Sequence, residues 1–439
     1  MNTATNLAQS DRRLEHFEEY TRCPQEVLEC LDGYREDGHS AAPARLDLQK
    51  VAAWVDELVA KDSHPQIVDR AIEALRLETY IDNSVEQARQ GVIKRAVRSA
   101  YYHLRPAFPV AFRKHLQQIA LKDWSSKPFP SWPVDVSVET LVAKQWAHLL
   151  HQHNVPELPF IWFWPDGKSA ACIMTHDVET GVGRDFCSSL MAMEARFGVV
   201  SAFEVVPEVR YSVPQDFLQS IREGGCEVCL HGLNHDGQLF SSREIFLSRA
   251  DRIRQYARDW GALGFRSPVM YRNLEWLPEL GFSYDMSVPN VGHLDPQPGG
   301  CCTVMPYFIG PLLELPLTTV QDYSLFNILG ERSTRIWETQ IERVMKANGL
   351  LSFIIHPDYV NEDWSSSLYL ALLEILARLR DDSNLWFALP RDVDMWWRMR
   401  QALGLVKVGS EWQIVGEGAN RARIAYARID NGTVRYRVS

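Results

Sequence analysis

Several features that would place a chain in a membrane, outside the cell or on nucleic acid are missing from this sequence of 439 residues. No apolar run reaches the roughly 18 residues of a membrane-spanning helix, so no membrane span is expected. The stretch 1–17 lacks the apolar core of a secretory signal, which predicts a cytoplasmic protein. The net charge of −10 disfavours general nucleic-acid binding, so no nucleic-acid partner is expected.

Cysteine is also scarce, and its pattern does not indicate a disulfide framework. The eight cysteines are Cys23, Cys30, Cys172, Cys187, Cys226, Cys229, Cys301 and Cys302. Without a signal peptide they are expected to be free thiols. Cys226 and Cys229 stand just before two histidines, which raises the alternative of a Cys₂His₂ zinc site. Because the two thiols would lie on opposite faces of a continuous strand, buried core thiols are the preferred interpretation.

The composition that remains is that of a folded globular protein, with 46% hydrophobic and 23% charged residues. The length suggests two or three domains. We expect a mostly helical N-terminal region over 1–155, a barrel over 156–400 and a small β-appendage over 401–439. The 14 tryptophans favour large buried aromatic surfaces over a sugar-stacking cleft.

The N-terminal region carries apolar residues at helical spacing, which predicts helices over 48–61, 66–81, 84–104 and 137–154. A basic cluster accompanies the third helix: Lys94, Arg95, Arg98, Arg105, Arg113 and Lys114. One interpretation is a patch for an anionic lipid head group or a diphosphate, and hence peripheral contact with a membrane surface. The other is an ordinary solvated helix face. The oligomeric state is not indicated.

From residue 160 onward, strand-like segments alternate with helical ones. The strand-like segments are 170–177, 200–207, 226–232, 264–268, 312–319, 350–357 and 385–390. This alternation predicts βα units and a parallel sheet. The fold class is therefore α/β, a distorted (β/α) barrel of about seven strands with an N-terminal helical extension. The tail adds a small antiparallel β-appendage, with Asp430-Asn431-Gly432 as its hairpin turn.

Polar side chains that can bind a metal or transfer a proton follow four of these strands. They are Thr175, His176, Asp177 and Glu179; His231 and His235; Arg266; and His356 with Asp358. Active-site residues of parallel βα folds project from the carboxyl ends of the strands, so these groups are expected to meet. Two imidazoles four residues apart and a carboxylate make a three-ligand site for a divalent metal. Asp177 and Glu179 point to one side of a strand, whereas Val178 points away.

The motifs resemble those of the polysaccharide deacetylases, the NodB-homology group of family 4 carbohydrate esterases. The four matching stretches are Thr175–Glu179, His231–His235, Arg266–Met270 and Ile354–His356, in the family's order. The resemblance covers roughly 165–395. It departs at Val178, where the family has a second aspartate, and at Met270, where it has glycine.

The resemblance implies a role for each matching residue. Asp177 would be the general base and Arg266 would orient it, while His356 would protonate the leaving amine. Zinc or a similar ion would be held by His231 and His235 together with a second acidic residue. Two arrangements stay open: Glu179 ligates the metal while Asp177 is the base, which is favoured, or Asp177 ligates the metal while Glu179 is the base.

Residues around these motifs carry weaker expectations. His176 is expected in the core. Tyr271 and Arg272 are candidate substrate contacts, because Met270 requires a rebuilt loop. The Gly/Pro-rich segment 293–308 falls where a lid over the barrel mouth would lie. Asp285 and Asp322 are undecided between a substrate-binding group and a strand-end cap.

The expected function is a metal-dependent amide hydrolase that removes an N-acyl group, acetyl by preference, from an amino sugar. A lipid-linked or other intracellular glycan intermediate fits the absence of a signal peptide. Two alternatives remain: a non-catalytic carbohydrate-binding or scaffold protein on a degenerate deacetylase frame, and a hydrolase of a C–N bond in a non-sugar compound.

Overall fold

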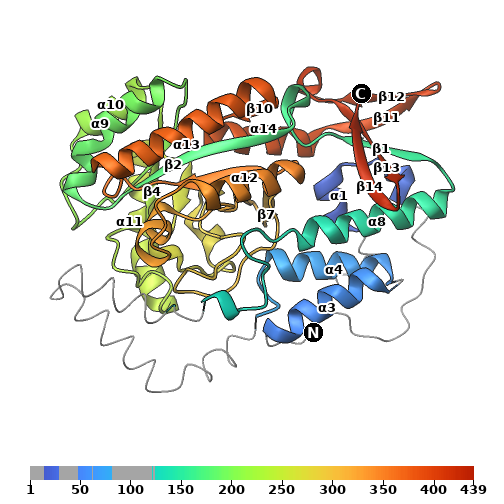
Figure 1. Ribbon diagram of the computed structural model, residues 1–439, viewed down its shortest axis with the longest axis horizontal. Coiled ribbons are helices and arrows are strands. Elements are labelled where there is room, and N and C mark those ends of the chain that lie inside the picture. The colour runs from blue at the N-terminus through green and yellow to red at the C-terminus, as the bar shows by residue number, and fades with distance from the viewer. Residues whose placement is uncertain (1–13, 29–47, 62, 82–120, 122–123) are drawn as a thin grey trace, which may run out of the picture.

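The computed structural model describes residues 14–28, 48–61, 63–81, 121 and 124–439 (Figure 1). The predicted helix over 84–104 and the basic cluster lie outside the described residues. Within the described ranges, no helix combines the length and the apolar character needed to cross a bilayer.

One curled sheet of nine strands forms the body of the protein, in the order β10-β2-β3-β4-β5-β6-β8-β7 with β9 paired to β2. The strands are β2 (Ala170–Val178), β3 (Ala202–Val205), β4 (Glu227–His231), β5 (Gly264–Arg266), β6 (Tyr284–Asp285), β7 (Tyr307–Ile309), β8 (Leu312–Glu314), β9 (Leu350–Ile354) and β10 (Leu385–Phe387). All pair in parallel except β7 with β8. The expected α/β class and distorted barrel are confirmed.

Helices cover the outside of this sheet (Figure 1). They are α9 (Gly181–Ala195), α10 (Gln215–Glu223), α11 (Arg243–Trp260), α12 (Arg335–Lys346), α13 (Asp363–Asp382) and α14 (Pro390–Ala402). All nine residues of β2 are buried, as expected for a strand covered on both faces. Leu190 of α9, Phe246 of α11 and Leu376 of α13 share one apolar cluster with Phe203 and Leu230 of the sheet.

Threonine hydroxyls join the segment 317–319 to β9. The Thr318 Oγ1 donates to the carbonyl of Leu350 at 2.7 Å and accepts from the amide of Ser352 at 3.0 Å. The Thr319 Oγ1 donates to the carbonyl of Ser352 at 2.7 Å. Side chains here satisfy buried backbone groups that a regular ladder would otherwise pair, which accounts for the distortion of the barrel at this point.

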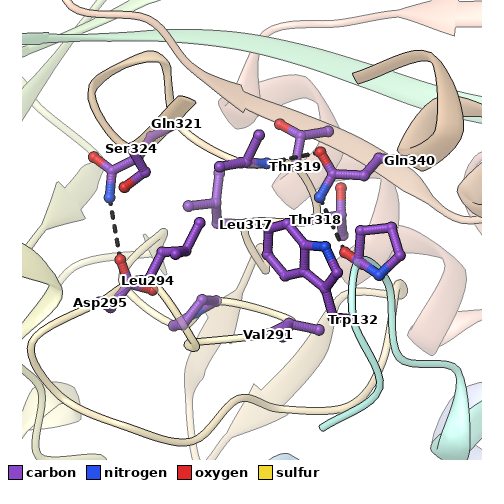
Figure 2. A pocket seen from close by; sticks show the side chains of 13 residues that line it. Trp132, Val291, Leu294, Asp295, Leu317, Thr318, Thr319, Gln321, Ser324 and Gln340 are labelled. Atoms are coloured by element: carbon purple, nitrogen blue, oxygen red, sulfur yellow. Dashed lines mark hydrogen bonds between the residues drawn. The ribbon is translucent and has the colours of Figure 1, made fainter. Parts of the chain in front are cut away.

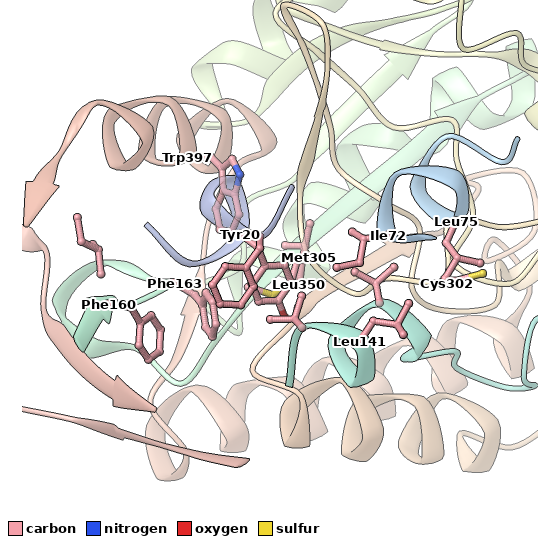
Figure 3. Packing of buried hydrophobic residues seen from close by; sticks show 14 of the residues in the cluster. Tyr20, Ile72, Leu75, Leu141, Phe160, Phe163, Cys302, Met305, Leu350 and Trp397 are labelled. Carbon is pink, nitrogen blue, oxygen red and sulfur yellow. The ribbon is translucent and has the colours of Figure 1, made fainter. Parts of the chain in front are cut away.

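The N-terminal helices and the C-terminal strands share a second core with the barrel (Figure 3). The helices are α1 (Glu15–Thr21), α2 (Gln25–Leu28), α3 (Leu48–Ala60), α4 (Pro65–Arg76) and α8 (Ser137–His153). Tyr20, Ile72 and Leu141 from these helices belong to the same buried cluster as Leu350 of β9 and Trp397 of α14. The apolar faces of the described helices α3, α4 and α8 therefore belong to the core that they share with the barrel.

The last part of the chain forms the predicted antiparallel strands β11 (Gly404–Val408), β12 (Glu411–Val415), β13 (Ile424–Asp430) and β14 (Thr433–Val438). Asn431 and Gly432 connect β13 to β14 with φ angles of 49° and 76°, the positive values that this tight hairpin requires. β1 (Glu157–Ile161) pairs antiparallel with β13. The three-part domain division stays a prediction. The seven described cysteines are free and buried.

The threonine contacts at β9 generate a stability prediction. Thr318→Val keeps the shape of the side chain but leaves the buried Leu350 carbonyl and Ser352 amide without their partner. We expect the free energy of unfolding to fall by about 2–4 kcal/mol in urea denaturation. The matched change Thr339→Val removes a hydroxyl whose hydrogen bond on α12 is exposed. It should lower the free energy of unfolding by less than about 0.5 kcal/mol. Equal losses in the two variants would contradict this role for Thr318.

Candidate active site

Strand alternation at the end of β2 separates His176 from its neighbours. The His176 Nδ1 lies 2.9 Å from the carbonyl of Ile355, and its Nε2 lies 2.8 Å from Glu194 Oε1 on α9. Its ring is fully buried. His176 therefore packs between the sheet and the helices, whereas Thr175 and Asp177 contact Arg266 in the barrel interior.

Arg266, at the end of β5, fixes the Asp177 carboxylate. Its Nη1 donates to Asp177 Oδ1 at 2.7 Å and to Thr175 Oγ1 at 2.9 Å, and lies 3.3 Å from Glu204 Oε2 on β3. Burial opposes ionisation of Asp177, but interactions with His231, Arg266 and His356 outweigh it and lower the pKa of this carboxyl. Asp177 is thus ionised, oriented and nearly enclosed, with 4% of the residue exposed.

Glu179, His231 and His235 bring three potential metal-ligand atoms together, all within 4.8 Å of one another. The His235 Nε2 lies 2.8 Å from Glu179 Oε1, and the His231 Nε2 lies 4.0 Å from the same oxygen. Among the described residues, the buried His231 Nε2 has no hydrogen-bond partner, whereas the His235 Nε2 meets the Glu179 carboxylate. Imidazole nitrogens facing a carboxylate have the donor set of a divalent-metal site.

The backbone orients His231, and the surroundings set the protonation states of His231 and Glu179. The His231 Nδ1 lies 3.2 Å from the carbonyl of Arg266, which directs the Nε2 toward Glu179. Burial lowers the pKa of His231 to about 4, so its imidazole is neutral at pH 7, the form that binds metals. Despite burial, His235 and His356 lower the pKa of Glu179 well below its usual value.

Asp177 borders the three-residue group. Its Oδ2 lies 3.6 Å from the His231 Nε2, while its Oδ1 is held by Arg266. Glu179, in contrast, contacts both histidines and keeps 18% of its side chain exposed. Both carboxylates thus lie within 4.0 Å of the His231 Nε2, and which of them is the metal ligand stays a prediction.

His356, beyond the end of β9, faces the same two carboxylates. Its Nε2 lies 3.6 Å from Glu179 Oε1 and 3.9 Å from Asp177 Oδ2. Asp322 accepts from the His356 backbone amide at 2.8 Å and lies 2.6 Å from the ring Nδ1. Although burial lowers the pKa of His356, Asp322 and Glu179 outweigh it and raise this pKa well above its usual value. His356 is therefore a protonated group aimed into the site.

Strained backbone surrounds these residues. His235, Val269 and Met270 have φ angles of 55°, 63° and 56°. Such values are uncommon outside glycine and are exceptional for a β-branched residue. At Gly232, where φ is 63°, an added Cβ would lie 2.5 Å from the ring of Pro268. The turn between the two histidines is thus pressed against the loop that follows Arg266, and such strain is concentrated at functional sites in many proteins.

Arg272, a predicted substrate contact, does not face the site. Its guanidinium is buried, forms a two-point ion pair with Glu78, and donates to the carbonyl of Met270 at 3.0 Å. The prediction is wrong because Glu78 already occupies the guanidinium. Nothing in the sequence indicated this pair, since Glu78 lies 194 residues away in the N-terminal region. Tyr271 does line a small pocket together with His235.

Asp285, which the sequence left undecided between a substrate-binding group and a strand-end cap, is paired with Ser287. Asp285 accepts hydrogen bonds from the amide and hydroxyl of Ser287, both at 2.8 Å. Ser287 in turn accepts from the amide of Ser267, directly after Arg266, at 2.8 Å. Asp285 therefore supports the backbone beside Arg266 and corresponds to the strand-end cap alternative.

No family model matches the sequence, and no curated protein matches it significantly. Solved structures similar to this chain include a provisionally named polysaccharide deacetylase from Mycobacterium smegmatis, at 19% identity over 57% of this chain and 98% of that one, with a TM-score of 0.44. Puue allantoinase is 14% identical over 54% of this chain and 92% of its own, with a TM-score of 0.40. A family 4 carbohydrate esterase from Streptomyces lividans is 13% identical over 51% of this chain and 93% of its own, with a TM-score of 0.34.

Proposed function

We propose that the protein is a metal-dependent amide hydrolase that removes an N-acyl group, with acetyl as the preferred group, from an amino sugar. The observation that carries the proposal is the meeting of three functional groupings at one point. Glu179, His231 and His235 form a metal-ligand set, the Asp177–Arg266 pair stands on one side, and the Asp322–His356 pair stands on the other.

The residues present fit a divalent cation, and zinc is the proposed ion. Two imidazoles and one ionised carboxylate supply three ligands, which is the number that catalytic zinc sites use. A bound ion would act as a Lewis acid toward the acyl carbonyl and would lower the pKa of water. Glu179, His231 and His235 would hold it.

The other side chains divide the proton transfers between them. Asp177, kept ionised by Arg266, is the base that takes a proton from the attacking water. His356, kept protonated by Asp322, donates a proton to the leaving nitrogen as the C–N bond breaks. The products are a carboxylate and a free amine. The two pairs resemble an acid–base division in which opposite environments move the two pKa values apart.

A first prediction concerns metal binding. His235→Ala should weaken Zn²⁺ binding by at least about 100-fold, because it removes one of three ligands. His153→Ala on α8 is the matched control, since that ring contacts the Val27 carbonyl and lies outside the ligand set. Equilibrium titration with a chromogenic zinc competitor measures both variants. Unchanged affinity in His235→Ala would contradict the proposed site.

A second prediction separates the base from the ligands. Asp177→Asn should lower kcat on an N-acetylated amino sugar by at least about 100-fold, because the amide cannot accept the proton. The same variant should retain its bound metal, measured by elemental analysis of the purified protein. Retained activity would refute Asp177 as the base. Loss of the metal would favour the arrangement in which Asp177 is a ligand and Glu179 is the base, and a wild-type protein that binds no metal would favour the scaffold alternative.

A further inference from the structure

The loop that follows Arg266 has an unfavourable backbone conformation next to the proposed metal ligands. Val269 and Met270 both have positive φ angles, which residues other than glycine rarely adopt. Backbone of this kind persists only where the surrounding structure holds it in place. Contacts from outside the loop must therefore keep 268–272 in this shape.

Two contacts press this loop against the segment 231–237, which carries both histidines of the ligand group. The Pro268 ring lies against Gly232, where an added Cβ would be 2.5 Å from it. Further along the segment, a Cβ added at Gly237 would lie 3.6 Å from the Tyr271 ring. The shape of the loop therefore limits where the two histidines can lie.

A carboxylate from the N-terminal region fixes the far end of the loop. Both Glu78 oxygens accept from the Arg272 guanidinium, and the Oε2 lies 2.6 Å from the Nε. The Arg272 Nη1 donates to the Met270 carbonyl at 3.0 Å, so the ion pair is joined directly to the strained backbone. Only 7% of the Glu78 side chain and none of the Arg272 side chain is exposed. Because a buried guanidinium without its carboxylate is strongly unfavourable, Glu78 determines where Arg272 lies.

The same carboxylate holds a second loop, 290–302. Glu78 Oε1 accepts from the Gly300 amide of this loop at 2.7 Å. The side chain of Gln297, also in this loop, accepts from the Arg272 amide at 2.9 Å and donates to the Arg272 carbonyl at 3.2 Å. Glu78 thus lies where the N-terminal region and both loops meet.

The loop 290–302 continues the connection toward His356. Asp295 lies in this loop, and its Oδ1 accepts from Gln321 Nε2 at 3.1 Å (Figure 2). Gln321 directly precedes Asp322, whose Oδ1 lies 2.6 Å from the His356 ring. Contacts from the N-terminal region therefore reach the histidine segment through one loop and the segment that orients His356 through the other.

We propose that Glu78 is a positioning residue, through which the N-terminal region fixes the loop 268–272 and, against that loop, the segment 231–237. Glu78 lies outside the ligand group and acts on it through Arg272. The consequence for metal binding and turnover rests on the proposed function. Loss of the Glu78 charge loosens the histidine segment and weakens the metal site without removing a ligand.

The test compares Glu78→Gln with Asp69→Asn in the full chain. Asp69, on α4, is the matched control, because it is a buried carboxylate of the N-terminal region that accepts from backbone amides of α1 instead of the loops.

Hydrogen exchange, measured by mass spectrometry, follows peptides that cover 231–237 and 268–272, and a chromogenic competitor reports Zn²⁺ affinity. Glu78→Gln should speed exchange in both segments at least about threefold, because the loop loses its anchor. It should weaken Zn²⁺ binding and lower kcat on an N-acetylated amino sugar by at least about tenfold each. Asp69→Asn should leave all of these values unchanged below its melting temperature.

The outcomes separate this inference from the proposed function. If the wild-type chain binds zinc, unchanged Zn²⁺ affinity in Glu78→Gln would overturn the positioning role, and so would an equal loss in Asp69→Asn. If the wild-type chain binds no zinc, the proposed function fails. Faster exchange of 231–237 in Glu78→Gln alone would then still support the positioning role, and unchanged exchange would overturn it.

Should Glu78→Gln fail to fold in thermal melting, Glu78→Asp decides. This variant keeps the charge beside Arg272 but is one methylene shorter, so it cannot reach both Arg272 and the Gly300 amide. It should lower Zn²⁺ affinity at least about threefold, and an unchanged affinity would count against the positioning role.

Discussion

The burial of ionised groups inside the barrel is the constraint on which the candidate site depends. Removing a single ion from water costs several kcal/mol, so each buried charge must have a partner in a fixed position. Arg266 meets this requirement for Asp177, and Asp322 meets it for His356. The same pairs that make the charges tolerable also determine which group is ionised and where it points.

The ligand group is the exception to this pairing. The Nε2 of His231 is buried without a hydrogen-bond partner among the described residues, and the Nε2 of His235 lies 2.8 Å from a Glu179 carboxylate that also faces His356. A folded protein rarely leaves such nitrogens unsatisfied, because each costs free energy comparable to a lost hydrogen bond. A cation at this point would supply the missing interaction, which is why we interpret the group as a metal site.

Much of this arrangement follows from local sequence, because alternation along a strand needs no knowledge of the rest of the fold. Alternation predicts Asp177 and Glu179 on one side of the strand and Val178 on the other, and the barrel class follows from the alternation of strands and helices. The role of Asp322 was not predictable, since it depends on a contact between two residues that are 34 positions apart in the chain. Arg272 was misassigned for the same reason. The predicted helix 66–81 ends at Arg76, and Glu78 takes a φ of 54° and reaches Arg272.

The central claim is that one cation is held by side chains from the ends of β2 and β4. Anomalous diffraction at the zinc absorption edge, from crystals of the full chain grown with Zn²⁺, tests it most directly. The account predicts a single strong anomalous peak within bonding distance of Glu179, His231 and His235, with Asp177 bound to Arg266 beside it. A peak elsewhere, or none at this position in a zinc-loaded protein, would contradict it.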